Sequence, residues 1–121
     1  MMLPEFLSQR EKEKFFRALN DGQKIDALNE MIEESKHIVF LGGAGVSTES
    51  GIPDFRSKDG LYNKKDSKFR NYKPEYLLGY DCLAKKPEIF FSYFRRNLDC
   101  RMLQPNDAHK KLAEMEQKGK L

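Results

Sequence analysis

Apolar residues recur at every third or fourth position along much of the chain, which is the spacing of helices with one apolar face. Pro74 and Pro87 are expected in the first turn of a helix, Asn106 at an N-cap and Gly119 just after a C-terminus. The pattern predicts helices over residues 5–19, 25–35, 74–84, 87–98 and 106–119.

One short segment departs from the helical pattern. Residues 38–41 (Ile-Val-Phe-Leu) form a continuous apolar run that is too short for a helix and is followed by glycine, which predicts a strand buried on both faces. No other run in the sequence has the features of a partner strand. We therefore expect an α/β fold, a fragment of a Rossmann-like parallel-sheet domain with one buried strand and several helices, cut short in mid-domain.

Residues 53–73 are polar and rich in turn-forming residues, as in Ser57-Lys58-Asp59-Gly60. A loop of this length is uncommon in a compact domain and usually binds a ligand or covers a site. The sequence thus predicts a long functional loop between the apolar run and the later helices.

Composition narrows the functional classes. The chain has 121 residues, of which 39% are apolar and 34% charged, and lacks both a membrane-spanning apolar stretch and a secretory signal, so we expect a cytoplasmic protein without membrane partners. The net charge of +3 includes no dominant basic stripe, which argues against nucleic-acid binding. Cys82 and Cys100 have the spacing of neither a zinc site nor a disulfide framework, so we expect no metal ligand here.

The glycine-rich segment Gly42–Gly51 follows the predicted strand and is expected to lead into a helix. Glycines let the backbone approach a ligand closely, and the free N–H groups of a first helical turn attract phosphate. No lysine followed by Ser or Thr comes after the glycines, which disfavours a nucleoside-triphosphate site. A dehydrogenase fingerprint has a third glycine where this chain has Thr48, and an acidic residue about twenty positions further on at the end of a second strand. Asp66 lies at about that spacing, but no strand is predicted before it, which disfavours hydride transfer.

Residues 43–56 (Gly-Ala-Gly-Val-Ser-Thr-Glu-Ser-Gly-Ile-Pro-Asp-Phe-Arg) and 59–62 (Asp-Gly-Leu-Tyr) resemble the signature of the sirtuins, the NAD-dependent protein deacylases, particularly bacterial members. Residues 105–109 (Pro-Asn-Asp-Ala-His) are similar to a second family motif. The resemblance covers residues 25–121, which it identifies as the N-terminal portion of the catalytic domain. Residues 1–24 are then a variable helical extension.

The resemblance implies that this chain binds NAD and, in the complete enzyme, acts on proteins with acylated lysines. Acyl transfer to ADP-ribose would release nicotinamide. It implies a diphosphate contact at Ala44, Gly45 and Thr48, beside Gly43, a nicotinamide contact at Asp54, a ribose shield at Phe55, and a phosphate or ribose contact at Arg56. Tyr62 stands where many members carry tryptophan. Two alternatives remain, a non-catalytic helical interaction fragment and an NAD-dependent ADP-ribosyltransferase relative.

The resemblance places the family's catalytic histidine, its T-Q-N-I-D segment and its zinc-binding cysteines beyond residue 121. We therefore expect no catalytic residue in this chain, zinc only in that further part, and no activity of this chain by itself. His37 and His109 are interpreted as structural. Family members that remove acidic acyl groups carry a Tyr-x-x-Arg pair, and this chain has Phe91 and Phe94 at those positions, which favours an acetyl group. Tyr93 and Arg96 also have the Tyr-x-x-Arg spacing, but they lie two residues out of register.

Overall fold

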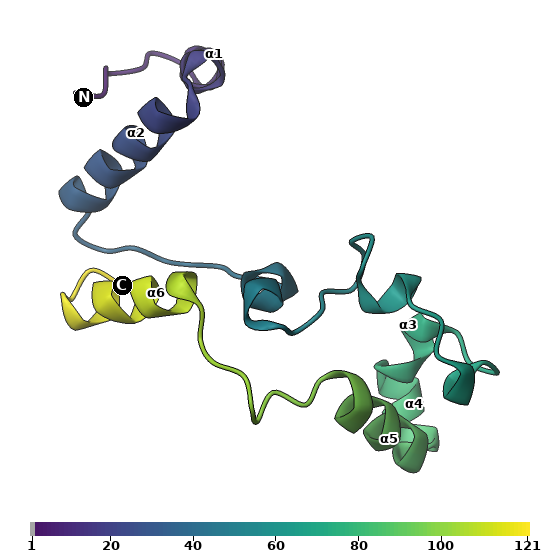
Figure 1. Cartoon of the computed structure of the whole chain (residues 1–121). Coiled ribbons are helices and arrows are strands. Elements are labelled where there is room, and N and C mark those ends of the chain that lie inside the picture. The colour runs from purple at the N-terminus through teal and green to yellow at the C-terminus, as the bar shows by residue number, and fades with distance from the viewer. Residues whose placement is uncertain (1) are drawn as a thin grey trace. The chain divides into compact units, whose positions relative to one another are not determined.

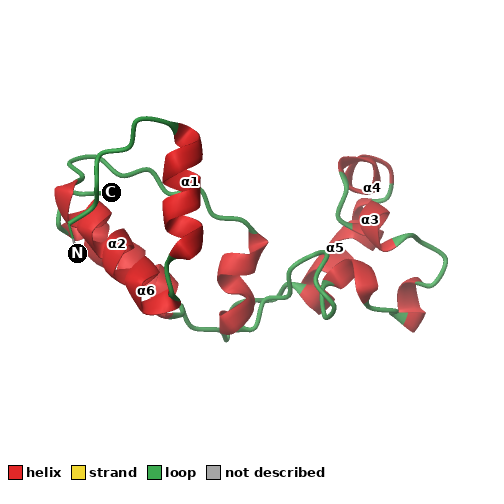
Figure 2. Cartoon of the chain, turned by 90° about the horizontal axis from the view of Figure 1, so that it is seen from above, coloured by secondary structure: helices red, strands yellow, loops and turns green. Residues whose placement is uncertain are grey.

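A computed structural model describes residues 2–121, and within them every regular element is a helix (Figures 1 and 2). The elements are α1 (Gln9–Ala18), α2 (Asp21–Glu34), η1 (Ala44–Ser50), η2 (Leu61–Asn63), η3 (Ser67–Phe69), α3 (Pro74–Leu77), α4 (Tyr80–Lys85), α5 (Pro87–Asn97) and α6 (Asp107–Gln117), where η marks a 3₁₀ helix. None of the helices in this described part is both long enough and apolar enough to cross a membrane.

The expected α/β fold is wrong for this structure, because residues 2–121 contain no strand. The apolar run is extended but open to solvent: Val39 is 94% exposed and Leu41 is 96% exposed. Its Ile38 N–H donates to the Lys120 carbonyl at 2.8 Å, a single bond rather than a ladder. A strand is held by a partner along its edge, and the described residues supply none, so apolar composition alone did not produce a sheet.

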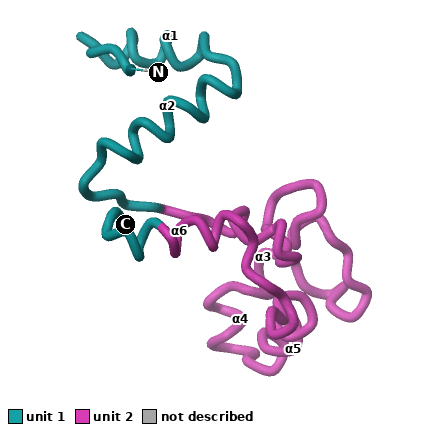
Figure 3. Tube along the Cα trace, turned by 60° about the vertical axis from the view of Figure 1, so that its left-hand side comes forward, with its two compact units in different colours: residues 1–40, 115–121 teal, residues 41–114 magenta. Residues whose placement is uncertain are grey.

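The chain divides into two compact units, one of residues up to 40 together with 115–121 and the other of residues 41–114 (Figure 3). In the first unit, Ser8 is the N-cap of α1, and its side chain accepts from the Glu11 N–H. An Asn20–Gln23 capping box starts α2. The Lys120 ammonium donates to the Ile32 carbonyl at 2.7 Å and so satisfies the end of α2.

The second unit has its core where η3, α3 and α5 meet. Phe69, Leu77 and Tyr93 are almost fully buried there, and the Phe69 and Tyr93 rings meet edge to face with centroids 5.2 Å apart. The helix expected over residues 74–84 is interrupted at Gly79, and α3 and α4 take its place. A Cβ on Gly79 would lie 3.2 Å from the Tyr76 carbonyl oxygen, which favours glycine at this turn.

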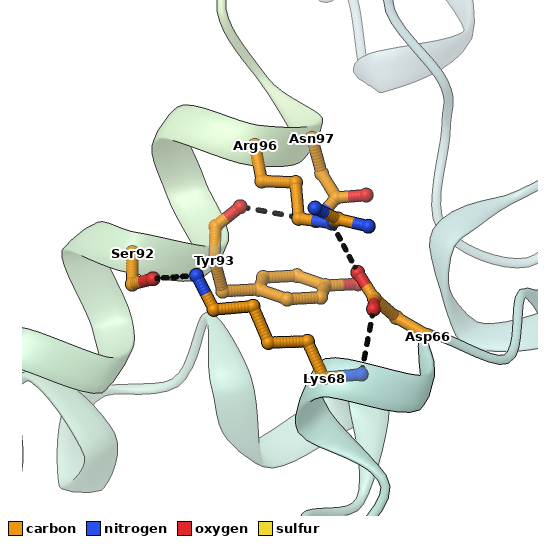
Figure 4. A network of polar contacts seen from close by, with 6 residues as sticks. All are labelled: Asp66, Lys68, Ser92, Tyr93, Arg96 and Asn97. Carbon is orange, nitrogen blue, oxygen red and sulfur yellow. Dashed lines mark hydrogen bonds and ion pairs between the residues drawn. The ribbon is translucent and has the colours of Figure 1, made fainter.

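Polar contacts hold part of the predicted long loop against α5 (Figure 4). The Arg96 Nε donates to the Asp66 carboxylate at 2.8 Å, and the Lys68 ammonium donates to the Ser92 hydroxyl at 3.2 Å. Burial raises the pKa of the Tyr93 hydroxyl, and the Asp66 carboxylate adds to that rise. The segment 53–73 is therefore not a featureless loop, since it includes η2 and η3 and is attached to a helix.

Candidate functional site

The glycine segment leads into a helix, as expected, and this helix is the seven-residue 3₁₀ helix η1. Its cap residue Gly43 and its residues Ala44, Gly45 and Thr48 are all exposed. A Cβ built on Gly43 or Gly45 would meet no atom within 4 Å, so the backbone at both positions is open to an approaching ligand. The Thr48 hydroxyl donates to the Gly45 carbonyl at 2.9 Å, which closes the turn from within.

The end of η1 depends on Gly51, which has a φ of 100° and so adopts the left-handed conformation that glycine favours. Its N–H donates to the Thr48 carbonyl at 3.0 Å. A Cβ here would lie 3.3 Å from a methyl group of Leu103. The sequence did not single out Gly51 for this role, although a glycine just past a predicted helix is a recognised signal.

Asp54, Phe55, Arg56 and Tyr62 form a second group. The Leu61 N–H donates to the Asp54 carbonyl at 2.8 Å, and the Tyr62 N–H donates to the Phe55 carbonyl at 2.9 Å. These bonds bring the Phe55 and Tyr62 rings to a centroid separation of 5.3 Å. The Arg56 guanidinium lies 5.4 Å from the centre of the Tyr62 ring, within cation–π range.

Two residues that were not among the predicted cofactor contacts, Gly60 and Asn63, shape this second group. A Cβ on Gly60 would lie 2.6 Å from the Asp54 Oδ1 and 2.7 Å from the Phe55 carbonyl, so only glycine fits there. The Asn63 side-chain amide donates to the Arg56 carbonyl at 3.2 Å and to the Ser57 carbonyl at 2.7 Å. The Asp59-Gly60 pair was a readable turn signal, whereas no local pattern announces the role of Asn63.

The Asp54 carboxylate already has partners within the loop, since its Oδ1 accepts from both the backbone N–H and the hydroxyl of Ser57. The structure thus brings Asp54, Phe55, Arg56 and Tyr62 together, and Gly43, Ala44, Gly45 and Thr48 together, as two groups. Among the described residues, no hydrogen bond, ion pair or ring contact joins η1 to residues 54–62.

The histidines differ from each other. His37 is exposed, whereas the His109 Nε2 lies 3.3 Å from the Ser47 hydroxyl of η1. Asn106 caps α6 as expected, because its Oδ1 accepts from the N–H groups of Ala108 and His109. His109 therefore has a local structural role, and it also touches the segment that bears the predicted diphosphate residues.

The residues considered for acyl preference lie on α5. Phe91 and Phe94 are 45% and 42% exposed. Tyr93 is buried in the core, and Arg96 is bound to Asp66, so this second pair has its side chains engaged within the fold.

No three His, Cys, Asp or Glu side chains gather as metal ligands within residues 2–121. Cys82 is buried in α4, where burial raises the pKa of its thiol, and Cys100 is exposed. Both cysteines are free thiols.

The two groups fit parts of a dinucleotide. An anionic diphosphate needs open backbone donors and a cation, and the open glycines of η1 and the exposed Arg56 side chain are of these types. Within the described residues, Arg56 has no carboxylate partner, so its charge is available to an anion. The Phe55–Tyr62 pair supplies an apolar aromatic surface beside it.

Comparison with known proteins agrees with the sequence motif. The model of the Sir2 family matches residues 43–121. Over 98 residues the chain is 49% identical to an NAD-dependent protein deacetylase of Clostridium perfringens and 46% identical to one of Clostridium acetobutylicum, and over 92 residues it is 46% identical to one of Listeria monocytogenes. These matches cover 76–81% of this chain and 38–39% of each relative's length. The chain belongs to the Sir2 family, the sirtuins that its glycine-loop signature resembles.

Proposed function

We propose that this chain is the NAD-binding part of an NAD-dependent protein-lysine deacetylase. The observation that carries the proposal is the family match over residues 43–121, which includes both groups of residues that fit a dinucleotide. Bound NAD would supply the ADP-ribose that takes the acyl group from lysine, with release of nicotinamide. Residues 25–121 would form the N-terminal portion of the catalytic domain, and residues 1–24 a variable extension.

The proposed contacts follow the two groups. The open backbone at Gly43 and Gly45, with Ala44 and Thr48 beside it, would hold the diphosphate. In the second group, Arg56 would contact phosphate or ribose through its exposed guanidinium, Phe55 and Tyr62 would exclude water from the ribose, and Asp54 would face the nicotinamide.

No residue of this chain is proposed as the catalytic base. His37 is exposed, and His109 is engaged with Ser47 and Asn106. We therefore expect no deacetylation by the 121-residue chain alone, because a positioned base contributes about 10²–10⁴-fold to such reactions. Release of nicotinamide from NAD in the presence of an acetyl-lysine peptide, above a protein-free control, would contradict this expectation.

Three finer features belong to the same proposal. Phe91 and Phe94 stand where the resemblance places the Tyr-x-x-Arg pair that contacts acidic acyl groups, which favours an acetyl group. Cys82 and Cys100 have no zinc role, and their free thiols suit a cytoplasmic location.

A chimera tests the proposal. Residues 24–121 replace the matched segment of the Clostridium perfringens deacetylase, to which the chain is 49% identical. We expect NAD-dependent deacetylation by the chimera and a rise of about ten- to a hundredfold in the KM for NAD when Arg56 is changed to Ala, the effect of losing one charge-assisted hydrogen bond.

Lys58→Ala provides the matched control, because Lys58 is an exposed cation two residues away in the same loop. Its KM for NAD is expected to stay within about twofold of the unsubstituted chimera, as for most exposed substitutions. A folded, active chimera in which Arg56→Ala and Lys58→Ala behave alike would remove Arg56 from the proposed site.

A further inference from the structure

The segment η1 has little apolar packing to fix its conformation. None of its residues is buried, and the Gly43 and Gly45 backbone is open on the side of a missing Cβ. Internal hydrogen bonds, such as Val46 N–H to the Gly43 carbonyl at 3.1 Å, shape the turn itself. Contacts from elsewhere in the chain must therefore contribute to holding the turn in place.

Two side chains at the start of α6 supply such contacts. The Asn106 Nδ2 donates to the Val46 carbonyl at 2.7 Å, and the His109 Nε2 lies 3.3 Å from the Ser47 hydroxyl. The two bonds span about sixty residues of sequence and reach consecutive positions of η1. Asn106 caps α6 through its Oδ1, so the bond from its Nδ2 to Val46 is additional to capping.

The network assigns the tautomer of His109. The Asn106 N–H donates to the His109 Nδ1 at 3.2 Å, so Nδ1 is the unprotonated nitrogen of a neutral ring. The Nε2 then carries the proton and donates to the Ser47 hydroxyl oxygen. Because its role towards Ser47 is that of a donor, His109 holds this serine in place and does not remove a proton from it.

We propose that Asn106 and His109 are positioning residues that hold η1 in its NAD-binding conformation. This inference rests on the proposed function. Val46 and Ser47 lie between the open Gly45 and Thr48, so bonds to their carbonyl and hydroxyl groups hold the loop and leave the glycine backbone accessible. Neither Asn106 nor His109 needs to touch the cofactor for this effect.

Two variants of His109 separate positioning from helix capping. Asn has an acceptor at the distance of Nδ1 and no group that reaches Ser47, whereas Gln has an amide donor at the distance of Nε2 and no acceptor at Nδ1. His109→Asn therefore keeps the bond from the Asn106 N–H, and His109→Gln keeps the bond to Ser47. Ser47→Ala removes the same contact from the other side.

The experiment uses the 121-residue chain labelled with ¹⁵N and kept below the concentration at which it aggregates. Long-range ¹H–¹⁵N spectra report the tautomer of His109, with His37→Gln used to assign the signals, since the chain has two histidines. Amide hydrogen exchange at Val46, Gly51 and Ile52 reports the η1 conformation without NAD, because these N–H groups close the turn. An NAD titration followed by chemical shifts gives the affinity.

We expect a protonated Nε2 and an unprotonated Nδ1 in the wild-type chain. His109→Asn and Ser47→Ala should each speed exchange in η1 and weaken NAD binding about two- to tenfold, the range for one neutral hydrogen bond. His109→Gln should remain close to wild type in both measurements. The double variant with both His109→Asn and Ser47→Ala should bind NAD no more weakly than either single variant, because the two substitutions remove the same contact.

Other results overturn the inference. If His109→Asn keeps wild-type affinity and His109→Gln loses it, the residue serves the α6 terminus alone. If Ser47→Ala changes neither exchange nor affinity, the contact positions nothing. If wild-type chain shows no shifts with NAD and the exchange results are as expected, the proposed function fails in this chain, and the link between the η1 contacts and the cofactor fails with it.

Discussion

Apolar segments are usually buried and polar loops exposed, but the apolar run at residues 38–41 and the polar loop at residues 54–63 show the opposite. Val39 and Leu41, from the apolar run, are almost fully exposed. In the polar loop Gly60 and Leu61 are buried, and the loop is closed by backbone bonds from Leu61 and Tyr62. Sequence hydrophobicity alone would have assigned burial to the first segment and exposure to the second.

The two segments differ in where their backbone hydrogen-bond partners lie along the sequence. The two backbone bonds that close the polar loop, from Leu61 to Asp54 and from Tyr62 to Phe55, each join residues seven positions apart, so the segment contains its own partners. A buried strand needs partners on both edges, and in a parallel sheet each partner is separated from it by a crossover of about a dozen residues or more. The polar loop therefore closes with residues of its own segment, whereas the apolar run would need partner strands from elsewhere to form a strand.

The largest expected effect concerns the open apolar run. An exposed β-branched and aromatic segment is a site of intermolecular pairing, so we expect the 121-residue chain to aggregate on concentration. Val39→Lys should strongly reduce light scattering, because a charge at the centre of such a run opposes pairing. Leu7→Lys is the control, since Leu7 is 93% exposed but lies outside the run. Equal scattering by the two variants would show that exposure in general, not this run, drives association.

Closure of the polar loop is expected to be sensitive to volume at Gly60. In Gly60→Ala the new Cβ would overlap the Asp54 carboxylate and the Phe55 backbone, and overpacking of this kind costs about 1–3 kcal/mol. The measurement is amide exchange at Leu61 and Tyr62, which should become faster. Gly43→Ala, whose Cβ would meet nothing within 4 Å, should leave the same amides unchanged.

A smaller effect is expected from Asn63. Asn63→Ala removes the two donated bonds to the Arg56 and Ser57 carbonyls, and because the side chain is exposed we expect a loss of about 1 kcal/mol in the stability of the loop. Asn71→Ala, at an exposed asparagine, is the control. If both variants give the same exchange at Tyr62, backbone bonds alone close the loop.

The sequence predicted most of the helices correctly, whereas the sheet that it predicted is absent from residues 2–121. Asn106 was recognised as the cap of α6, and Pro74 and Pro87 as first-turn residues, because these signals act within one helical turn. The break at Gly79 was missed, since a single glycine inside an apolar helical pattern is often tolerated. The strand prediction was wrong because a strand needs partner strands, and residues 2–121 contain none.

In the candidate site too, features set by local sequence were predicted, whereas a contact between distant residues was not. The motif identified the family and located the residues of both groups, and these residue roles remain predictions. The contact between Ser47 and His109 was not predicted, because no local pattern links positions sixty-two residues apart. His109 was interpreted as structural, which its place in the α6 cap supports, but its second contact appears only when the chain is folded.

The smallest expected effect tests local closure at a third place, the pair Asp99 and Arg101. The Arg101 guanidinium donates to both carboxylate oxygens of Asp99, at 2.9 and 2.6 Å, and the Arg101 N–H donates at 3.2 Å. Hydrogen bonds from the Arg101 side chain, then from its backbone, lower the pKa of Asp99 from 3.8 to about 2. Because the pKa of Asp99 is lower in the folded chain, the pair contributes fully to stability above pH 3.8, and this contribution is lost as the pH falls through about 2.

Arg101→Gln should return the carboxyl pKa of Asp99 towards 3.8 in an NMR titration, with little change in folding at neutral pH because both side chains are exposed. An ordinary pKa for Asp99 in the wild-type chain would mean that closeness in sequence does not suffice to hold an exposed pair together, and it would limit the comparison to segments closed by backbone bonds.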